Sequence, residues 1–135
     1  MRILPTRLHG VLDYLVSAVL INSPWLFGFA DGGGARMWVP IVLGSGSIVY
    51  SLLTDYELGI VHDHAIQMSA HLFLDLASGV VLAASPWLFG FADEVKWPHV
   101  IIGLFEITAA LITRKHSGFG ERHNMGRPST TRLAS

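Results

Sequence analysis

Cysteine is absent from this chain of 135 residues. Its absence excludes disulfides, thiolate catalysis and cysteine-ligated metal sites. Charge is also scarce, since Asp, Glu, Lys and Arg make up 14% of the residues whereas hydrophobic residues make up 51%. The formal net charge of −1 gives no basic surface of the kind that nucleic-acid binding uses. With a mean hydropathy of +0.49, the composition is unusually apolar for a soluble domain of this size.

The few charges are unevenly distributed along the chain. Four stretches are almost free of them: 8–29, 37–54, 70–91 and 97–113. Within these stretches, the only Asp, Glu, Lys or Arg residues are Asp13, Asp75 and Glu106. A helix needs about 20 apolar residues to cross a bilayer, whereas each helix of a soluble bundle carries a charged stripe. The pattern therefore predicts an all-α, polytopic membrane protein with a four-helix transmembrane domain over residues 1–115.

An internal repeat is the strongest feature of the sequence. Residues 23–31 read Ser-Pro-Trp-Leu-Phe-Gly-Phe-Ala-Asp, and residues 85–93 repeat this motif letter for letter. Flanking residues also match at the same offset of 62 residues, among them His9 with His71 and Asp13 with Asp75. Self-similarity at a fixed offset is the signature of a duplicated structural unit.

The second half of each unit matches at a shorter offset. The first copy carries three additional loop residues near the glycine run 32–34, and beyond them Thr54 matches Thr113 at an offset of 59. Each unit thus contains a charge-poor stretch, a short loop and a second charge-poor stretch. We predict two tandem helical hairpins, about 8–54 and 70–114, related by a pseudo-two-fold axis along the membrane normal.

These residues resemble the SPW-repeat family of small bacterial membrane proteins. The hallmark of that family is a Ser-Pro-Trp triplet in the first of two membrane helices per repeat. Both triplets are intact in this chain: Ser23-Pro24-Trp25 and Ser85-Pro86-Trp87. The resemblance covers about residues 8–114 and implies two membrane hairpins. It implies neither an activity nor a site, because the family has no established activity.

The triplet suits the end of a membrane helix. Pro24 lacks an N–H and leaves the carbonyl group of Leu20 without its helical donor. In hydrocarbon that carbonyl needs another donor, for which the Ser23 hydroxyl is a candidate, and the second triplet repeats the arrangement. Tryptophan prefers the interface between bilayer and water. We expect all four tryptophans at one membrane face: Trp25, Trp38, Trp87 and Trp97. A role in shaping and anchoring the helix end is favoured over ligand binding.

Lys and Arg residues are concentrated toward the chain termini. Seven lie on the side of the two termini, and only Arg36 and Lys96 lie in the hairpin loops. Because positive residues accumulate on the cytoplasmic side of a membrane, both termini are predicted to lie in the cytoplasm, with the protein in the cell membrane. Residues 116–135 have no apolar periodicity and are predicted to form a disordered basic cytoplasmic tail.

The second stretch of each repeat carries small residues on one helical face. These are Gly44, Ser47 and Ser51 in the first copy, and Gly103, Glu106 and Ala110 at the equivalent positions of the second. Small residues let membrane helices approach closely. Glu106 therefore occupies a position on a packed face, and we expect it to point into the protein.

Five ionisable residues form a candidate buried polar cluster: His9, Asp13, His71, Asp75 and Glu106. Each His–Asp pair is spaced by four residues and shares a helical face. Carboxylates inside a membrane are costly and mark proton relays or ion sites. Alternatively, the His–Asp pairs satisfy each other and Glu106 is protonated and bonded to a neighbouring helix. The structural interpretation is preferred, because no pathway is visible in the sequence.

No motif for catalysis or metal binding is complete. His62-Asp63-His64 offers groups that bind zinc or copper, but no further ligand spacing completes a site, and a solvated loop is favoured. Phosphate-binding loops, nucleophile elbows and metalloprotease helices are absent. The sequence therefore predicts no enzyme, no cofactor, no metal and no nucleic-acid partner.

Two functions remain open. The first is a structural or interaction module in the lipid bilayer, as a homo-oligomer or with another membrane protein. The second is a proton- or small-solute-conducting transporter component that uses Asp13, Asp75 and Glu106. Convergence of these carboxyl groups on one cavity favours transport. A separate hydrogen-bond partner for each carboxyl group favours the module.

Overall fold

Four α-helices make up the fold. The computed structural model describes residues 3–55, 58–60 and 66–115. In chain order the elements are α1 (Thr6–Leu26), the 3-10 turn η1 (Ala30–Gly32), α2 (Gly34–Leu53), α3 (Met68–Leu88) and α4 (Trp97–Ile112). The described residues contain two isolated bridges and no β-sheet, so the predicted all-α class is confirmed. The segment His62-Asp63-His64 and the predicted tail 116–135 lie outside the described residues.

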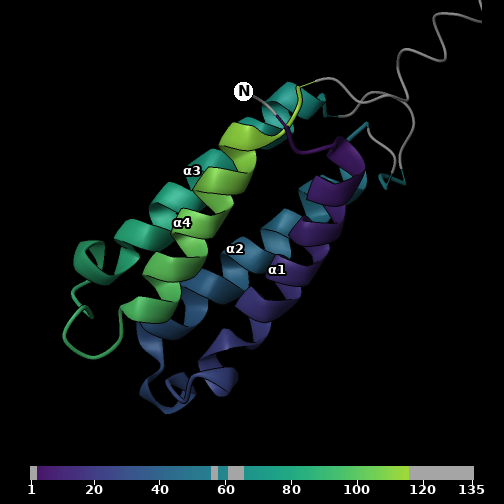
Figure 1. The fold of residues 1–135 in the computed structure, drawn as a ribbon. Coiled ribbons are helices and arrows are strands. Elements are labelled where there is room, and N and C mark those ends of the chain that lie inside the picture. Colours follow the sequence, from purple (N-terminus) through teal and green to yellow (C-terminus); the bar gives the residue numbers. More distant parts are fainter. Residues whose placement is uncertain (1–2, 56–57, 61–65, 116–135) are drawn as a thin grey trace, which may run out of the picture.

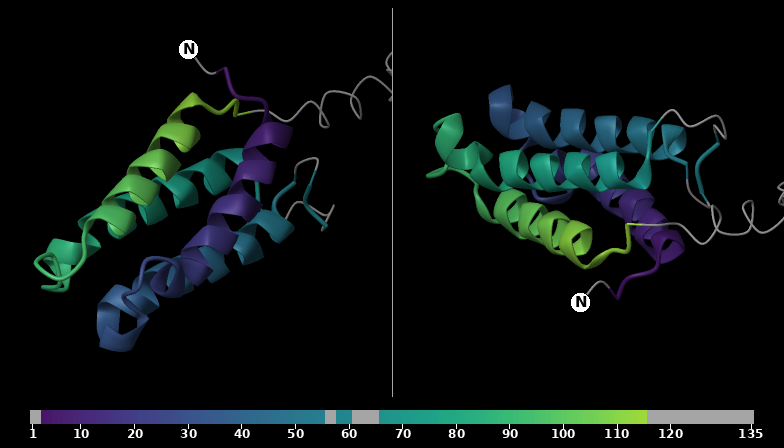
Figure 2. Two further views of the ribbon diagram at one scale, coloured as in Figure 1. Left: turned by 60° about the horizontal axis from the view of Figure 1, so that its bottom comes forward. Right: turned by 90° about the horizontal axis from the view of Figure 1, so that it is seen from above.

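The helices pair as two hairpins. α1 packs along α2, and α3 packs along α4, through the most extensive helix contacts in the chain (Figure 1). α2 and α3 bring the two hairpins together, whereas α1 and α4 contact each other much less. Figure 2 shows the same arrangement from two further sides, with both hairpin loops at one end of the molecule.

The duplication in the sequence is reproduced in the helix boundaries. α1 and α3 each contain 21 residues, and they begin and end at positions that are equivalent at the offset of 62. α2 and α4 end immediately before the equivalent residues Thr54 and Thr113. The segments that precede α1 and α3 bridge across the repeats, since Leu4 pairs with Thr113 and Ile66 pairs with Thr54. The two repeats are therefore joined reciprocally at the end opposite the hairpin loops.

Glycine residues set the ends of the first helix in each hairpin. The apolar stretches continue to residues 29 and 91, beyond the ends of α1 and α3. Gly28 has φ of 70° and Gly90 has φ of 73°. This left-handed conformation is readily adopted by glycine and commonly terminates a helix. The helices are therefore a few residues shorter than the apolar stretches.

The Ser-Pro-Trp triplets occupy the last turn of α1 and of α3. The Ser23 hydroxyl donates to the Leu20 carbonyl oxygen at 2.8 Å, and the Ser85 hydroxyl donates to the Leu82 carbonyl oxygen at 2.7 Å. These are the carbonyl groups that the following prolines leave without an N–H donor. The predicted role of the serines in supplying a substitute donor is confirmed.

Apolar side chains cover the outside of the bundle. Each helix exposes large hydrophobic residues, for example Leu15, Val42, Phe73 and Ile101, which are 59% to 67% exposed. Among the described residues, twelve buried ones are polar or charged and eight are hydrophobic. Soluble domains bury their hydrophobic residues preferentially. The reversed distribution suits a bundle whose surroundings are as apolar as its own side chains.

Hydropathy and tryptophan placement agree with a membrane environment. α2 and α3 are long and apolar enough to cross a membrane, and α4 is apolar but shorter. The tryptophans are 56% to 64% exposed: Trp25, Trp38, Trp87 and Trp97. They lie near the ends of α1 and α3 and near the starts of α2 and α4. All four therefore lie at the end of the bundle that carries the hairpin loops.

Small residues permit close helix contact inside each hairpin. Gly44, Ser47 and Ser51 are buried on α2, as predicted. On α4, a Cβ atom added at Gly103 would lie 2.6 Å from the carbonyl oxygen of Gly79 on α3. No larger residue fits at that distance without movement of the backbone, so the glycine permits the approach of α3 to α4.

Candidate functional site

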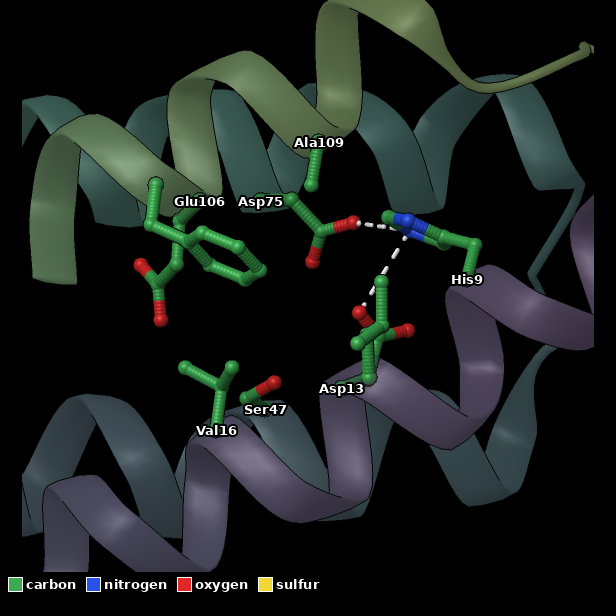
Figure 3. A pocket seen from close by; sticks show the side chains of 9 residues that line it. His9, Asp13, Val16, Ser47, Asp75, Glu106 and Ala109 are labelled. Atoms are coloured by element: carbon green, nitrogen blue, oxygen red, sulfur yellow. Dashed lines mark hydrogen bonds and ion pairs between the residues drawn. The ribbon is translucent and has the colours of Figure 1, made fainter. Parts of the chain in front are cut away.

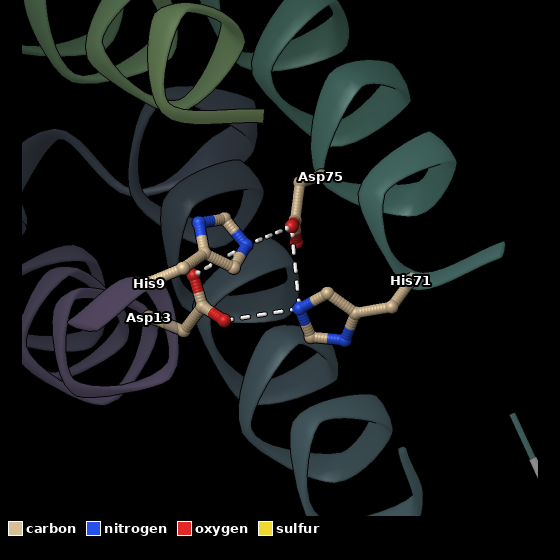
Figure 4. A group of neighbouring side chains, drawn as sticks. All are labelled: His9, Asp13, His71 and Asp75. Atoms are coloured by element: carbon tan, nitrogen blue, oxygen red, sulfur yellow. Dashed lines mark hydrogen bonds and ion pairs between the residues drawn. The ribbon is translucent and has the colours of Figure 1, made fainter. Parts of the chain in front are cut away.

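One histidine and one aspartate from each of α1 and α3 form a buried cluster (Figure 4). His9 and Asp13 lie one turn apart on α1, and His71 and Asp75 lie one turn apart on α3. Both histidine side chains are almost fully buried, and the aspartate side chains are 9% and 6% exposed. These four residues are called the His–Asp cluster.

The shortest contacts in the His–Asp cluster cross between the repeats. His9 Nε2 lies 2.9 Å from Asp75 Oδ2, and His71 Nε2 lies 3.0 Å from Asp13 Oδ2. Contacts within each helix are longer, at 3.4 Å from His9 to Asp13 and 3.3 Å from His71 to Asp75. Each histidine therefore pairs chiefly with the aspartate of the other hairpin. The cluster links α1 to α3 in a reciprocal manner that matches the sequence repeat.

Two threonines orient the histidine rings from the opposite side. Thr113 Oγ1 lies 3.0 Å from His9 Nδ1, and Thr54 Oγ1 lies 2.9 Å from His71 Nδ1. Each hydroxyl also donates its hydrogen to a backbone carbonyl oxygen, with both distances at 2.6 Å. A carbonyl oxygen can only accept, so each threonine oxygen accepts a hydrogen bond from Nδ1–H. The Nδ1 atoms therefore carry protons, and the Nε2 atoms face the carboxylates.

Tyr50 breaks the symmetry of the cluster. Its hydroxyl donates to Asp75 Oδ1 at 2.6 Å. The equivalent residue in the second repeat is Ala109, which has no group to offer Asp13. Asp75 consequently accepts one more hydrogen bond than its counterpart, and the two aspartates have different environments despite their equivalent positions.

Glu106 lies beside the cluster on α4. Figure 3 shows its side chain directed into a small cavity that Ser47 and three cluster residues also line: His9, Asp13 and Asp75. The cavity volume is about 10 Å³, which is room for about one water molecule. Glu106 Oε2 is buried and has no hydrogen-bond partner among the described residues. The three carboxyl groups thus converge on one cavity, while Asp13 and Asp75 are also satisfied by histidine.

A third buried histidine among the described residues lies near the hairpin loops and was not singled out from the sequence. His99 is 1% exposed and lies between the rings of Phe29 and Phe91, at centroid distances of 5.3 and 5.0 Å. Its Nε2–H donates to the carbonyl oxygen of Arg36 at 2.9 Å. The residue links α4 to the start of α2, away from the His–Asp cluster.

The structure brings together all five residues of the candidate polar cluster. The residues that sequence reasoning missed are Tyr50, Thr54 and Thr113. The threonines carried a signal, because they match at the repeat offset and sit at equivalent helix ends. Tyr50 gave no signal in the comparison of the repeats, because the equivalent residue is an alanine. The triplet residues lie at the other end of their helices and do not contribute to this site.

The His–Asp cluster has the donor set of a metal site. The two imidazole nitrogens and two carboxylate oxygens lie within 4.8 Å of one another. Zinc and other transition-metal ions accept this combination of nitrogen and oxygen ligands. The sequence predicted no metal, because it showed two separate pairs and not the contact between them.

Comparison with known proteins gives one match. The model of the family described as SPW repeat domain matches residues 7–113, which is most of the chain. No curated protein and no solved structure matches the chain.

Proposed function

The chain belongs to the SPW repeat family, and we propose that it is a four-span protein of the cell membrane that serves as a structural or interaction module. In this proposal the two hairpins form one rigid unit, and the apolar outer surface contacts lipid and a membrane partner. The partner is a second copy of the chain or another membrane protein. Neither catalysis nor nucleic-acid binding forms part of the proposed role.

The reciprocal pairing in the His–Asp cluster carries this proposal. Each histidine contacts the aspartate of the other hairpin, at 2.9 and 3.0 Å. The ionisable groups are therefore engaged in joining the hairpins. A partly satisfied buried polar group is costly in an apolar medium, so these pairs favour one arrangement of α1 against α3. The adjoining cavity holds about one water, which is consistent with a static core.

The distribution of side chains supports four membrane crossings. Large hydrophobic residues are exposed on all four helices, whereas the cluster, the serines and the threonines lie inside. The exposed tryptophans at one end suit the headgroup region. α4 has 16 residues, which is short for a span, and bilayers accommodate such helices by local thinning. The bias of Lys and Arg toward the termini supports cytoplasmic termini.

Site-specific photo-crosslinking in the native membrane tests the interaction module. A photoreactive amino acid is placed at one exposed position on each helix: Leu15, Val42, Phe73 or Ile101. One helix face should give a discrete protein adduct, with twice the mass of the chain if the partner is a second copy. The fully buried position Leu82 serves as the control and should give no intermolecular adduct. Failure of all four exposed positions to crosslink would contradict the proposal.

A second candidate function is proton conduction, and the convergence of carboxyl groups favours it. Glu106, Asp13 and Asp75 line one cavity, and Glu106 Oε2 lacks a hydrogen-bond partner among the described residues. Intramembrane carboxyl groups of this kind occur in proton relays. The narrow cavity implies that conduction by this chain would pass single protons and exclude larger solutes.

Proton flux in reconstituted vesicles tests the second candidate. The unmutated protein should dissipate an imposed pH gradient, and Glu106→Gln should abolish the flux while the protein remains folded. Asp93→Asn, at an exposed loop position, is the matched control and should leave the flux unchanged. Absence of flux from the unmutated protein under gradients of either sign would eliminate this function without affecting the module.

A further inference from the structure

The His–Asp cluster presents two imidazole nitrogens and two carboxylate oxygens from two helices at one point in the interior. We propose that His9, Asp13, His71 and Asp75 bind one divalent transition-metal ion, with zinc the best match. The inference concerns these four residues alone. It depends neither on the number of membrane crossings nor on the function proposed above.

The nitrogen-to-oxygen distances in the cluster are close to those of tetrahedral coordination. Zinc binds imidazole nitrogen and carboxylate oxygen at about 2.0–2.2 Å, so adjacent ligand atoms of a tetrahedral site lie about 3.3–3.5 Å apart. Asp75 Oδ2 lies 2.9 Å from His9 Nε2 and 3.3 Å from His71 Nε2. Asp13 contacts the histidines through both of its oxygens, with Oδ2 3.0 Å from His71 Nε2 and Oδ1 3.4 Å from His9 Nε2. Two of these distances already have the tetrahedral value, and the other two require an outward movement of a few tenths of an ångström.

The threonines prepare both histidines as ligands. A metal-binding histidine usually donates the N–H of its second ring nitrogen to an oxygen atom, which fixes the tautomer and aims the ring. Thr113 accepts from His9 Nδ1–H at 3.0 Å, and Thr54 accepts from His71 Nδ1–H at 2.9 Å. Once a metal ion replaces the protons between Nε2 and the carboxylates, both Nε2 lone pairs point at the same place. The presence of this support at both histidines, through equivalent threonines, is the strongest argument for ligation.

The carboxylates complete the site in charge and in geometry. The Tyr50 hydroxyl donates a hydrogen bond to Asp75 Oδ1 at 2.6 Å. The other carboxylate oxygen, Oδ2, is the atom that faces the histidines. Ligating carboxylates are commonly held by an outer hydrogen bond of this type. Two aspartates and two neutral histidines carry a charge of −2, which a divalent cation cancels. A neutral site is favourable in a buried, apolar environment because an uncompensated charge is expensive there.

The adjoining cavity lies beside the four-ligand site. It has room for about one water, and it is lined by both aspartates and by Glu106. The Oε2 atom of Glu106 is buried and has no hydrogen-bond partner in the described part of the chain. A water held there beside the aspartate ligands would give Glu106 Oε2 a hydrogen-bond donor.

Metal titration of the full chain in detergent tests the proposal. The purified protein is stripped with a chelator and titrated with Zn²⁺ and, separately, with Co²⁺. We expect one ion per chain and, for Co²⁺, the intense visible absorption of a tetrahedral complex. His71→Gln and Asp13→Asn should each weaken binding by more than 100-fold. Thr113→Val should weaken it by roughly 10–100-fold, as loss of an outer-shell partner does.

Two control variants identify where the ion binds. His99→Gln alters a buried histidine outside the cluster and should leave the affinity unchanged. The double variant His62→Asn with His64→Asn removes the two histidines of the sequence segment 62–64 and should also retain the tight site. Affinity that survives both His71→Gln and Asp13→Asn overturns the proposal, as does affinity lost only in the loop variant. If His71→Gln does not fold, Thr113→Val and the Co²⁺ spectrum decide, and an octahedral spectrum or unchanged affinity overturns the site.

Discussion

Asp75 has the richest set of contacts among the ionisable residues of the His–Asp cluster. It lies 2.9 Å from His9 Nε2 and 3.3 Å from His71 Nε2, and it accepts the Tyr50 hydroxyl at 2.6 Å. Its counterpart Asp13 has the two histidines but no tyrosine. A duplicated sequence has thus produced two aspartates with the same position and different hydrogen bonding.

The difference between the two aspartates should appear in their mutational cost. Asp75→Ala should lower the free energy of unfolding by about 3–5 kcal/mol, as expected when a buried ion pair loses one partner. Asp13→Ala should cost about 1.5–3 kcal/mol less, because no hydrogen bond from Tyr50 to a charged group is lost. Reversible unfolding in mixed detergent micelles, followed by circular dichroism, measures both values.

A Tyr50→Phe background provides the control for this comparison. In that background neither aspartate has a tyrosine partner, so the two alanine substitutions should have nearly equal costs. The cost of Asp75→Ala minus the cost of Asp13→Ala is measured in both backgrounds. The decrease of this value in the Tyr50→Phe background is the coupling energy of Tyr50 with Asp75. Equal costs already in the unmutated background would show that the tyrosine contributes nothing.

The triplet residues make a second prediction at the residue scale. Ser23→Ala should cost about 1 kcal/mol, because the Leu20 carbonyl loses the hydroxyl that replaces its helical donor. In a Pro24→Ala background, the new N–H at position 24 bonds to the same carbonyl. The cost of Ser23→Ala should then fall close to zero in the same unfolding assay. A cost that is the same in both backgrounds would argue against the substitute-donor role.

At the scale of the elements, each hairpin depends on close backbone contact. A Cβ atom at Gly103 would lie 2.6 Å from Gly79 O and 2.7 Å from Ala83 N, both on α3. In the other hairpin, a Cβ atom at Gly44 would lie 2.9 Å from Ser17 O on α1. Both hairpins therefore use a glycine at the equivalent position of their second helix to bring the two backbones together.

Gly103→Ala should destabilise the protein by about 1–3 kcal/mol, because the added methyl group forces α3 and α4 apart. Gly46→Ala is the matched control: it lies inside α2, and a Cβ atom there meets nothing within 4 Å. Since alanine has a higher helix propensity than glycine by up to about 1 kcal/mol, this variant should be neutral or stabilised. Thermal unfolding in detergent compares the two, and a loss of similar size in both would contradict the packing argument.

At the scale of the whole molecule, the two hairpins form a bundle with a polar interior and an apolar exterior. The Ser-Pro-Trp triplets and all four tryptophans lie at the hairpin-loop end, and the His–Asp cluster lies toward the opposite end, near the start of α1 and the end of α4. The molecule therefore has two chemically distinct ends. Its orientation in a membrane therefore decides which of these two ends faces the cytoplasm.

Reporter fusions test that orientation. A reporter fused after Ser117 should be active on the cytoplasmic side, and one inserted within residues 31–36 should be active on the outer side, because Lys and Arg residues are concentrated near the termini. Signals from the same side for both fusions would contradict a hairpin that crosses the membrane twice. A C-terminal reporter active only outside would reverse the predicted orientation.

Features that depend on neighbours along the chain could be predicted from the sequence by itself. The repeat determined the number of helices and their equivalence, the Ser-Pro-Trp triplets marked the ends of α1 and α3, and the spacing of small residues determined which face of α2 is packed. Each His–Asp pair was also visible, since residues four apart share a helical face. These results follow from local backbone geometry and from hydropathy, which need no knowledge of the contacts between helices.

The site itself was decided by the tertiary structure. Spacing along α1 could pair His9 only with Asp13, whereas the packed hairpins place it closer to Asp75 than to its own helical neighbour, at 2.9 against 3.4 Å. Thr113, 104 residues away, reaches the same ring. Such contacts depend on how α1 and α3 approach each other, which is set by packing across the bundle and not by any pattern within one helix. For that reason two unremarkable pairs in the sequence became one four-ligand cluster in the folded chain.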